Sequence, residues 1–138
     1  MQPFSVEHII PRQAGGETTL DNLALACQGC NGHKYVKTEG VGPVSGELVP
    51  LFHPRRQLWR EHFAWNADFT LIIGLTPTGR ATVEVLQLNR EGLINLRRYR
   101  TRWEITLRQN RPRRQELTPA VRIDCHSAQD NALAATLE

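Results

Sequence analysis

Three segments near the start of the chain decide its fold: VEHIIP at 6–11, LDNL at 20–23 and CQGCNGHK at 27–34. The first contains an acidic residue beside a histidine. The second places an asparagine fourteen positions after that histidine, and the third begins with a C-x-x-C pair. Carboxylate, imidazole, amide and thiol groups in one short stretch are typical of metal binding and acid–base chemistry.

The residues around these segments predict a strand, a loop, a second strand and a short helix. Residues 4–6 alternate as in a short edge strand that ends at Glu7-His8, and residues 11–19 have the glycines and polar residues of a loop. Residues 23–26 are short and apolar, and residues 31–38 have the features of a short helix that stops near Gly40.

This order and spacing resemble the HNH endonucleases, whose nuclease site is a ββα-metal hairpin. The resemblance implies an α+β fold, in which an N-terminal ββα-metal (HNH) hairpin is followed by a small α+β extension. We expect the HNH motif at residues 1–40, the extension at 41–108 and a weakly ordered tail at 109–138. Residues 47–98 are also similar to the accessory part of a group of bacterial, often cyanobacterial, HNH proteins.

The resemblance assigns roles to three of the N-terminal residues. In HNH enzymes the acid before the histidine binds the catalytic metal and the histidine activates water, so Glu7 is expected to be a metal ligand and His8 the general base. Histidine can accept a proton near neutral pH, as this role requires. Adjacent residues of a regular strand point to opposite faces, so we expect a bend at Glu7-His8. Asn22 is the middle asparagine of the motif and is expected to brace the loop through its amide.

Two residues compete for the third position of the motif. Asn31 directly follows Cys30 and is the favoured second metal ligand, whereas His33 lies about 200° further around a helix and is the alternative. Lys34 is expected to contact a phosphate, because the start of a helix already favours anions. Oxygen ligands from Glu7 and Asn31 favour Mg²⁺ or Mn²⁺, and coordination by His33 would favour Mn²⁺, Ni²⁺ or Zn²⁺.

Cys27 and Cys30 form half of a structural Zn²⁺ site, which needs four ligands. Related HNH proteins often carry another C-x-x-C shortly before the Glu-His strand, but the six residues before Glu7 include no cysteine or histidine. Three alternatives follow: the chain lacks an upstream segment, the zinc site has been lost, or the other ligands come from elsewhere, such as Cys125-His126.

The charge distribution favours DNA as the partner. Residues 55–114 carry thirteen arginines and five acidic residues, and phosphate contacts by such residues release counterions. Residues 97–103 (RRYRTRW) are expected either to grip a duplex backbone or to form a solvated helix face. We see no signal peptide or membrane span, and three cysteines are too few for a disulfide framework, so we expect a cytoplasmic protein. The sequence does not predict the oligomeric state.

Two other functions compete with a metal-dependent DNA endonuclease. One is a non-catalytic zinc-knuckle module that binds nucleic acid or protein, and the other is a truncated, inactive relative. The presence of both Glu7 and His8 favours the nuclease, because a binding module needs neither.

The extension shows local patterns without recognisable chemistry. We expect strands at 47–52, 69–75 and 81–86, with a turn at 77–79, and helices at 55–64 and from 89 towards 107. The aromatic residues of this region are expected in the core rather than as base-stacking platforms: Trp59, Phe63, Trp65 and Phe69.

Overall fold

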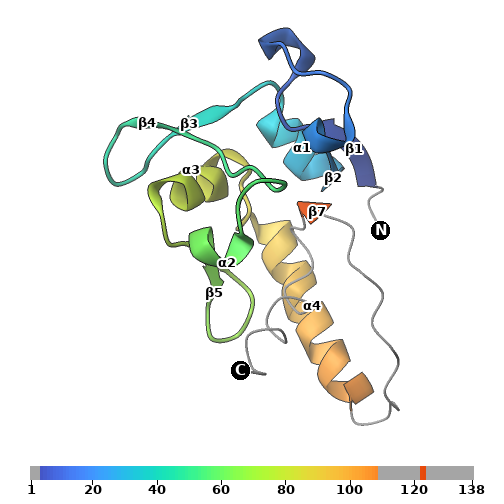
Figure 1. Cartoon of the computed structure of the whole chain (residues 1–138). Helices are drawn as coiled ribbons and strands as arrows, with labels where there is room; N and C mark the ends of the chain where they lie inside the picture. The colour runs from blue at the N-terminus through green and yellow to red at the C-terminus, as the bar shows by residue number, and fades with distance from the viewer. Residues whose placement is uncertain (1–3, 109–121, 124–138) are drawn as a thin grey trace.

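A computed structural model describes residues 4–108 and 122–123 and has an α+β architecture (Figure 1), as expected. The N-terminal part consists of β1 (Phe4–His8), two short 3₁₀ turns (Arg12–Ala14 and Leu20–Asn22), β2 (Leu23–Cys27) and α1 (Gln28–Lys34). Two hairpins and three helices follow: β3 (Glu39–Val41), β4 (Leu48–Pro50), α2 (Trp59–His62), β5 (Phe63–Trp65), β6 (Ile72–Gly74), α3 (Pro77–Val85) and α4 (Glu91–Arg108).

The strands β1 and β2 pair antiparallel from Phe4↔Cys27 to His8↔Leu23, and α1 packs on both of them. We call these three elements the ββα unit. Beside β2 lies β7 (Arg122–Ile123), in parallel, so that β1 is the edge of a three-stranded sheet in the order β1-β2-β7. The expected order of strand, loop, strand and helix is therefore confirmed. However, α1 begins inside the C-x-x-C segment rather than after it and ends at Lys34, so the expectation that Lys34 lies at the start of the helix was wrong. The rest of the tail expected at 109–138 lies outside the described residues.

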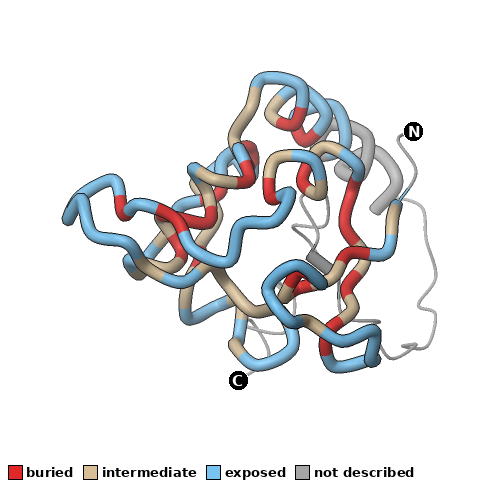
Figure 2. The backbone as a smooth tube through the Cα atoms, turned by 90° about the horizontal axis from the view of Figure 1, so that it is seen from above, coloured by how far each residue is buried: buried red, intermediate tan, exposed pale blue. Residues whose placement is uncertain are grey.

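One hydrophobic cluster joins the ββα unit to the extension. Its buried members come from both parts: Cys27, Cys30, Phe63, Ile72, Leu86, Leu88 and Leu93. Trp59 and Trp65 pack against it, with ring centroids 5.8 Å apart. Figure 2 shows the buried positions gathered in the interior and the outer loops exposed. The core role is thus confirmed for three of the four aromatic residues, whereas Phe69 is 38% exposed and has a φ of 57°.

The prediction of a turn at 77–79 and a strand at 81–86 was wrong, because these residues form the helix α3. Thr76 caps the helix by accepting a hydrogen bond from the Gly79 amide (3.0 Å), and Pro77 lies in its first turn. Threonine followed by proline is a signal for a helix start. The β-branched residues that suggested a strand occupy positions on the helix instead.

The helix predicted at 55–64 is also much shorter than expected. Only Trp59–His62 are helical, and the chain continues directly into β5, which pairs with β6. The helix predicted from residue 89 is confirmed as α4. Within it, Arg97 is buried and donates hydrogen bonds to the backbone oxygens of Thr70 (2.9 Å) and Leu88 (2.6 Å). This arginine therefore has a structural role, and neither of the two expectations for it, a DNA contact or a solvated helix face, holds.

None of the helices in the described part of the chain is both long and apolar enough to cross a bilayer.

Tyr35 ends α1 in a backbone conformation that disfavours a side chain. Its φ is 49° and its ψ −120°, and its side chain is 69% exposed. Tyr35→Gly should therefore relieve strain while losing little packing, and we expect it to stabilise the protein by about 1 kcal/mol and to raise the melting temperature by about 4 °C. Thermal unfolding followed by circular dichroism measures this, with Tyr35→Ala, which keeps the Cβ, as the control. An equal melting temperature for the two variants would contradict the prediction.

Candidate active site

The facing surfaces of β1 and α1 form a polar contact at the centre of the ββα unit. Ser5 and Glu7 lie two residues apart on β1 and point to the same side. Asn31 and Lys34, one turn apart on α1, meet them: Asn31 Nδ2 donates to Ser5 Oγ (2.9 Å) and Lys34 Nζ to Glu7 Oε1 (2.5 Å). The expected metal ligands Glu7 and Asn31 thus lie on facing elements, and the expected phosphate contact Lys34 binds Glu7.

Glu7 and Lys34 form a buried ion pair. Glu7 is 4% exposed and Lys34 6% exposed. The ammonium also donates to the backbone oxygen of His8 (3.0 Å), so it ties the end of β1 to α1. Pairing is what makes burial of both charges tolerable. A phosphate contact by Lys34 would require its ammonium to exchange at least part of this pairing for the phosphate.

His8 points away from Glu7. The ladder between β1 and β2 continues through both residues, so the expected bend at Glu7-His8 is absent and their side chains leave opposite faces of the strand. The ring of His8 is partly exposed, and its Nε2 shares a hydrogen bond with Thr18 Oγ1 (2.9 Å). Within the described residues no hydrogen bond reaches Nδ1. Thr18 was missed because no pattern distinguishes it from the other polar residues of its loop.

Asn22 is buried and closes the loop between the two strands. Its Oδ1 accepts a hydrogen bond from the Ile10 amide (2.8 Å), and its Nδ2 donates to the backbone oxygens of Ile10 (2.9 Å) and Glu17 (2.8 Å). Its own backbone oxygen accepts from the Ile9 amide (2.8 Å). The side chain therefore fixes the segment after His8 against the segment that carries Thr18.

Asn22→Ala should destabilise the protein by about 2–3 kcal/mol, because it leaves several backbone groups of the loop without their partner. Chemical denaturation measures this loss. Asn31→Ala serves as the control, because it removes a single side-chain hydrogen bond, to Ser5, and should cost about 1 kcal/mol. Equal losses in the two variants would contradict a bracing role for Asn22.

The donor set at this contact suits a hard divalent cation. A carboxylate oxygen from Glu7 and an amide oxygen from Asn31 are ligands of the kind that Mg²⁺ and Mn²⁺ prefer. In the part of the chain that the structure describes, no group of three His, Cys, Asp or Glu side chains could hold a metal. His33 lies two residues beyond Asn31 on α1, on another side of the helix.

Cys27 and Cys30 are buried at the start of α1, where a guanidinium contacts both of them. Arg90 Nη2 lies 3.7 Å from Cys27 Sγ and Arg90 Nη1 3.8 Å from Cys30 Sγ. Burial opposes the charge of Arg90, but hydrogen bonds and electrostatic attraction from Cys30 and Cys27 raise the pKa of Arg90 overall. A Cβ on Gly29 would lie 2.4 Å from Arg90 Nη2, so glycine permits this approach. A structural zinc site needs four ligands, so these two thiols could supply at most half of one. The alternative ligands Cys125-His126 lie outside the described residues.

Comparison with known proteins agrees with the arrangement of these elements. No curated protein and no solved structure matches the chain. The model of one family, described as HNH endonuclease, matches residues 1–37, which include β1, β2 and α1. The protein therefore carries an HNH domain at its N-terminus, which associates it with nucleic acid and with the nucleases of that family.

Proposed function

We propose that this protein is a metal-dependent endonuclease that hydrolyses phosphodiester bonds of DNA. The HNH domain supports a nucleic-acid-related function, and nucleases with this domain generally use divalent metals. The observation that carries the proposal is the position of Glu7 and His8 on opposite faces at the end of the edge strand β1. In-line displacement at phosphorus needs the attacking and leaving oxygens on opposite sides of the phosphate. A phosphate bound at this edge would have the His8 side on one flank and the Glu7 side on the other.

His8 is the general base in this proposal. Its Nδ1 would take the proton of a water molecule aimed at phosphorus, while the hydrogen bond between Nε2 and Thr18 keeps the ring in place. Asn22 acts indirectly, because it holds together the loop segments on either side of His8 and Thr18.

Glu7 and Asn31 would hold the cation on the other side of the strand. Bound there, Mg²⁺ or Mn²⁺ would neutralise charge that develops on the phosphate. The residues of the chain set the geometry: α1 is fixed on β1 by the bonds of Asn31 to Ser5 and of Lys34 to His8.

A non-catalytic nucleic-acid-binding protein is the second candidate. The Glu7–Lys34 pair favours it, because the buried carboxylate already has a cationic partner from the chain itself. A plasmid-nicking assay separates the two functions. The nuclease should convert supercoiled plasmid to nicked or linear DNA with Mg²⁺ or Mn²⁺ and lose this activity in EDTA. A protein that retards the plasmid in a gel but never cleaves it with either ion would contradict the proposal.

A further inference from the structure

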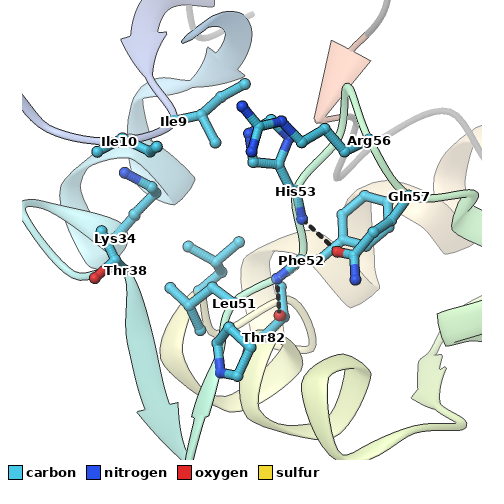
Figure 3. A pocket seen from close by; sticks show the side chains of 12 residues that line it. Ile9, Ile10, Lys34, Thr38, Leu51, Phe52, His53, Arg56, Gln57 and Thr82 are labelled. Atoms are coloured by element: carbon cyan, nitrogen blue, oxygen red, sulfur yellow. Dashed lines mark hydrogen bonds between the residues drawn. The ribbon is translucent and has the colours of Figure 1, made fainter. Parts of the chain in front are cut away.

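A pocket of about 340 Å³ lies between the HNH domain and the extension (Figure 3). Residues 9–10, Lys34 and Thr38 line one side. The other side is lined by residues 50–53 and 56–57, together with Thr82 and Leu86. The volume lies in the range of about 300–1,000 Å³ that is typical of sites for small molecules. The pocket is therefore large enough to hold one nucleotide-sized group.

The walls of the pocket are largely apolar. Ile9 and Leu86 are buried, and Leu51 is a further apolar lining residue. A flat hydrophobic group such as a nucleobase suits walls of this kind, and enzymes that act on nucleic acids often bind an unstacked base between apolar side chains.

The second wall of the pocket carries a positive charge. Arg56 supplies it, whereas the charge of Lys34 is paired with Glu7, and the lining includes no aspartate or glutamate. Arg56 is exposed, and within the described residues its guanidinium makes no hydrogen bond or ion pair, whereas the neighbouring Arg55 donates to the backbone oxygen of Leu23 (2.8 Å). Burial and then the charge of Arg56 lower the pKa of His53, so this imidazole is neutral at pH 7 and can share a hydrogen bond with a ligand.

The pocket adjoins the proposed active site. Ile9 directly follows His8 in the chain, and Lys34 both lines the pocket and binds Glu7. A group in the pocket therefore lies close to the residues that would act on the phosphodiester bond.

We propose that this pocket binds one nucleotide of the DNA strand, with its base against Ile9, Leu51 and Leu86 and its phosphate at Arg56. The choice of a nucleotide over other anions rests on the proposed function. Inorganic phosphate would leave the apolar walls without a contact, and a purely apolar ligand would leave the guanidinium of Arg56 unpaired.

Titration of the full chain in EDTA, followed by ¹⁵N–¹H NMR, tests this inference. The probes are thymidine 5′-monophosphate, deoxyribose 5-phosphate and inorganic phosphate, and the proteins are wild type, Arg56→Gln and the matched control Arg60→Gln. Arg60 is exposed on α2 and does not line the pocket, so the control makes the same change of charge elsewhere.

We expect thymidine 5′-monophosphate to shift resonances of the lining residues and to bind several-fold more tightly than deoxyribose 5-phosphate. Arg56→Gln should weaken its binding about fivefold, and Arg60→Gln by less than about twofold. Equal binding of all three probes, equal effects of the two substitutions, or shifts remote from the pocket would overturn the inference.

The titration needs no cleavage, so its outcome is independent of catalysis. A protein that binds the nucleotide in the pocket yet never nicks plasmid supports this inference and contradicts the proposed function. Metal-dependent nicking without nucleotide binding in the pocket supports the proposed function and contradicts this inference.

Discussion

Replacing His8 with alanine should lower the rate of DNA cleavage by about 10²–10⁴-fold, which is the usual contribution of a general base. The variant should still fold, because the ring is partly exposed and makes one hydrogen bond, with Thr18, among the described residues. It should also bind DNA almost as well as the wild type, because phosphate binding depends mainly on arginine and lysine side chains. Plasmid nicking with Mg²⁺ or Mn²⁺ measures the rate, and gel retardation in EDTA measures the binding.

His8→Gln is the control that separates position from proton transfer. The glutamine amide can reach Thr18 as Nε2 does, but it cannot accept a proton from water. Loss of cleavage in both variants therefore supports a base, whereas recovery in His8→Gln would assign His8 a purely positional role. Cleavage by His8→Ala at the rate of the wild type would contradict the proposed mechanism.

The local parts of the site could be predicted because their signals lie close together in the sequence. Strand, loop, strand and helix follow from composition between residues 4 and 38, and the amide of Asn22 bonds to backbone no more than twelve positions away. The resemblance of this stretch to HNH endonucleases was the basis for the roles assigned to Glu7, His8 and Asn22. It also implied a bend at Glu7-His8 that the regular ladder between β1 and β2 does not show.

The long-range contacts could not be predicted from a single sequence. Lys34 and Glu7 are 27 positions apart, and nothing in the spacing distinguishes a buried pair from a free lysine at a helix. Arg90 meets Cys30 from 60 positions away, so an arginine that resembled the rest of the basic region was not recognised as a partner of the thiols. In α3, the strand prediction for residues 81–86 overlooked the helix-start signal at Thr76-Pro77, where the threonine hydroxyl caps the helix.

The ion pair between Lys34 and Glu7 leads to the largest expected effect on stability. Lys34→Met should leave the carboxylate of Glu7 buried without its partner, and breaking a buried pair in this way costs about 3–5 kcal/mol. Chemical denaturation in EDTA measures the loss. The double variant Glu7→Gln/Lys34→Met carries no buried charge at this position and should be more stable than Lys34→Met.

Divalent metal should restore part of the stability of Lys34→Met if Glu7 is a metal ligand. A ligand that binds only the folded state stabilises it by about 2.7 kcal/mol at a hundred times its dissociation constant. Removing the ammonium leaves the carboxylate available, so millimolar Mn²⁺ or Mg²⁺ should raise the melting temperature of Lys34→Met by several degrees and that of the double variant by much less. Equal responses of the two variants to the metal would show that Glu7 is not a metal ligand. A stability of Lys34→Met in EDTA equal to that of the wild type would show that the pair is not buried in solution.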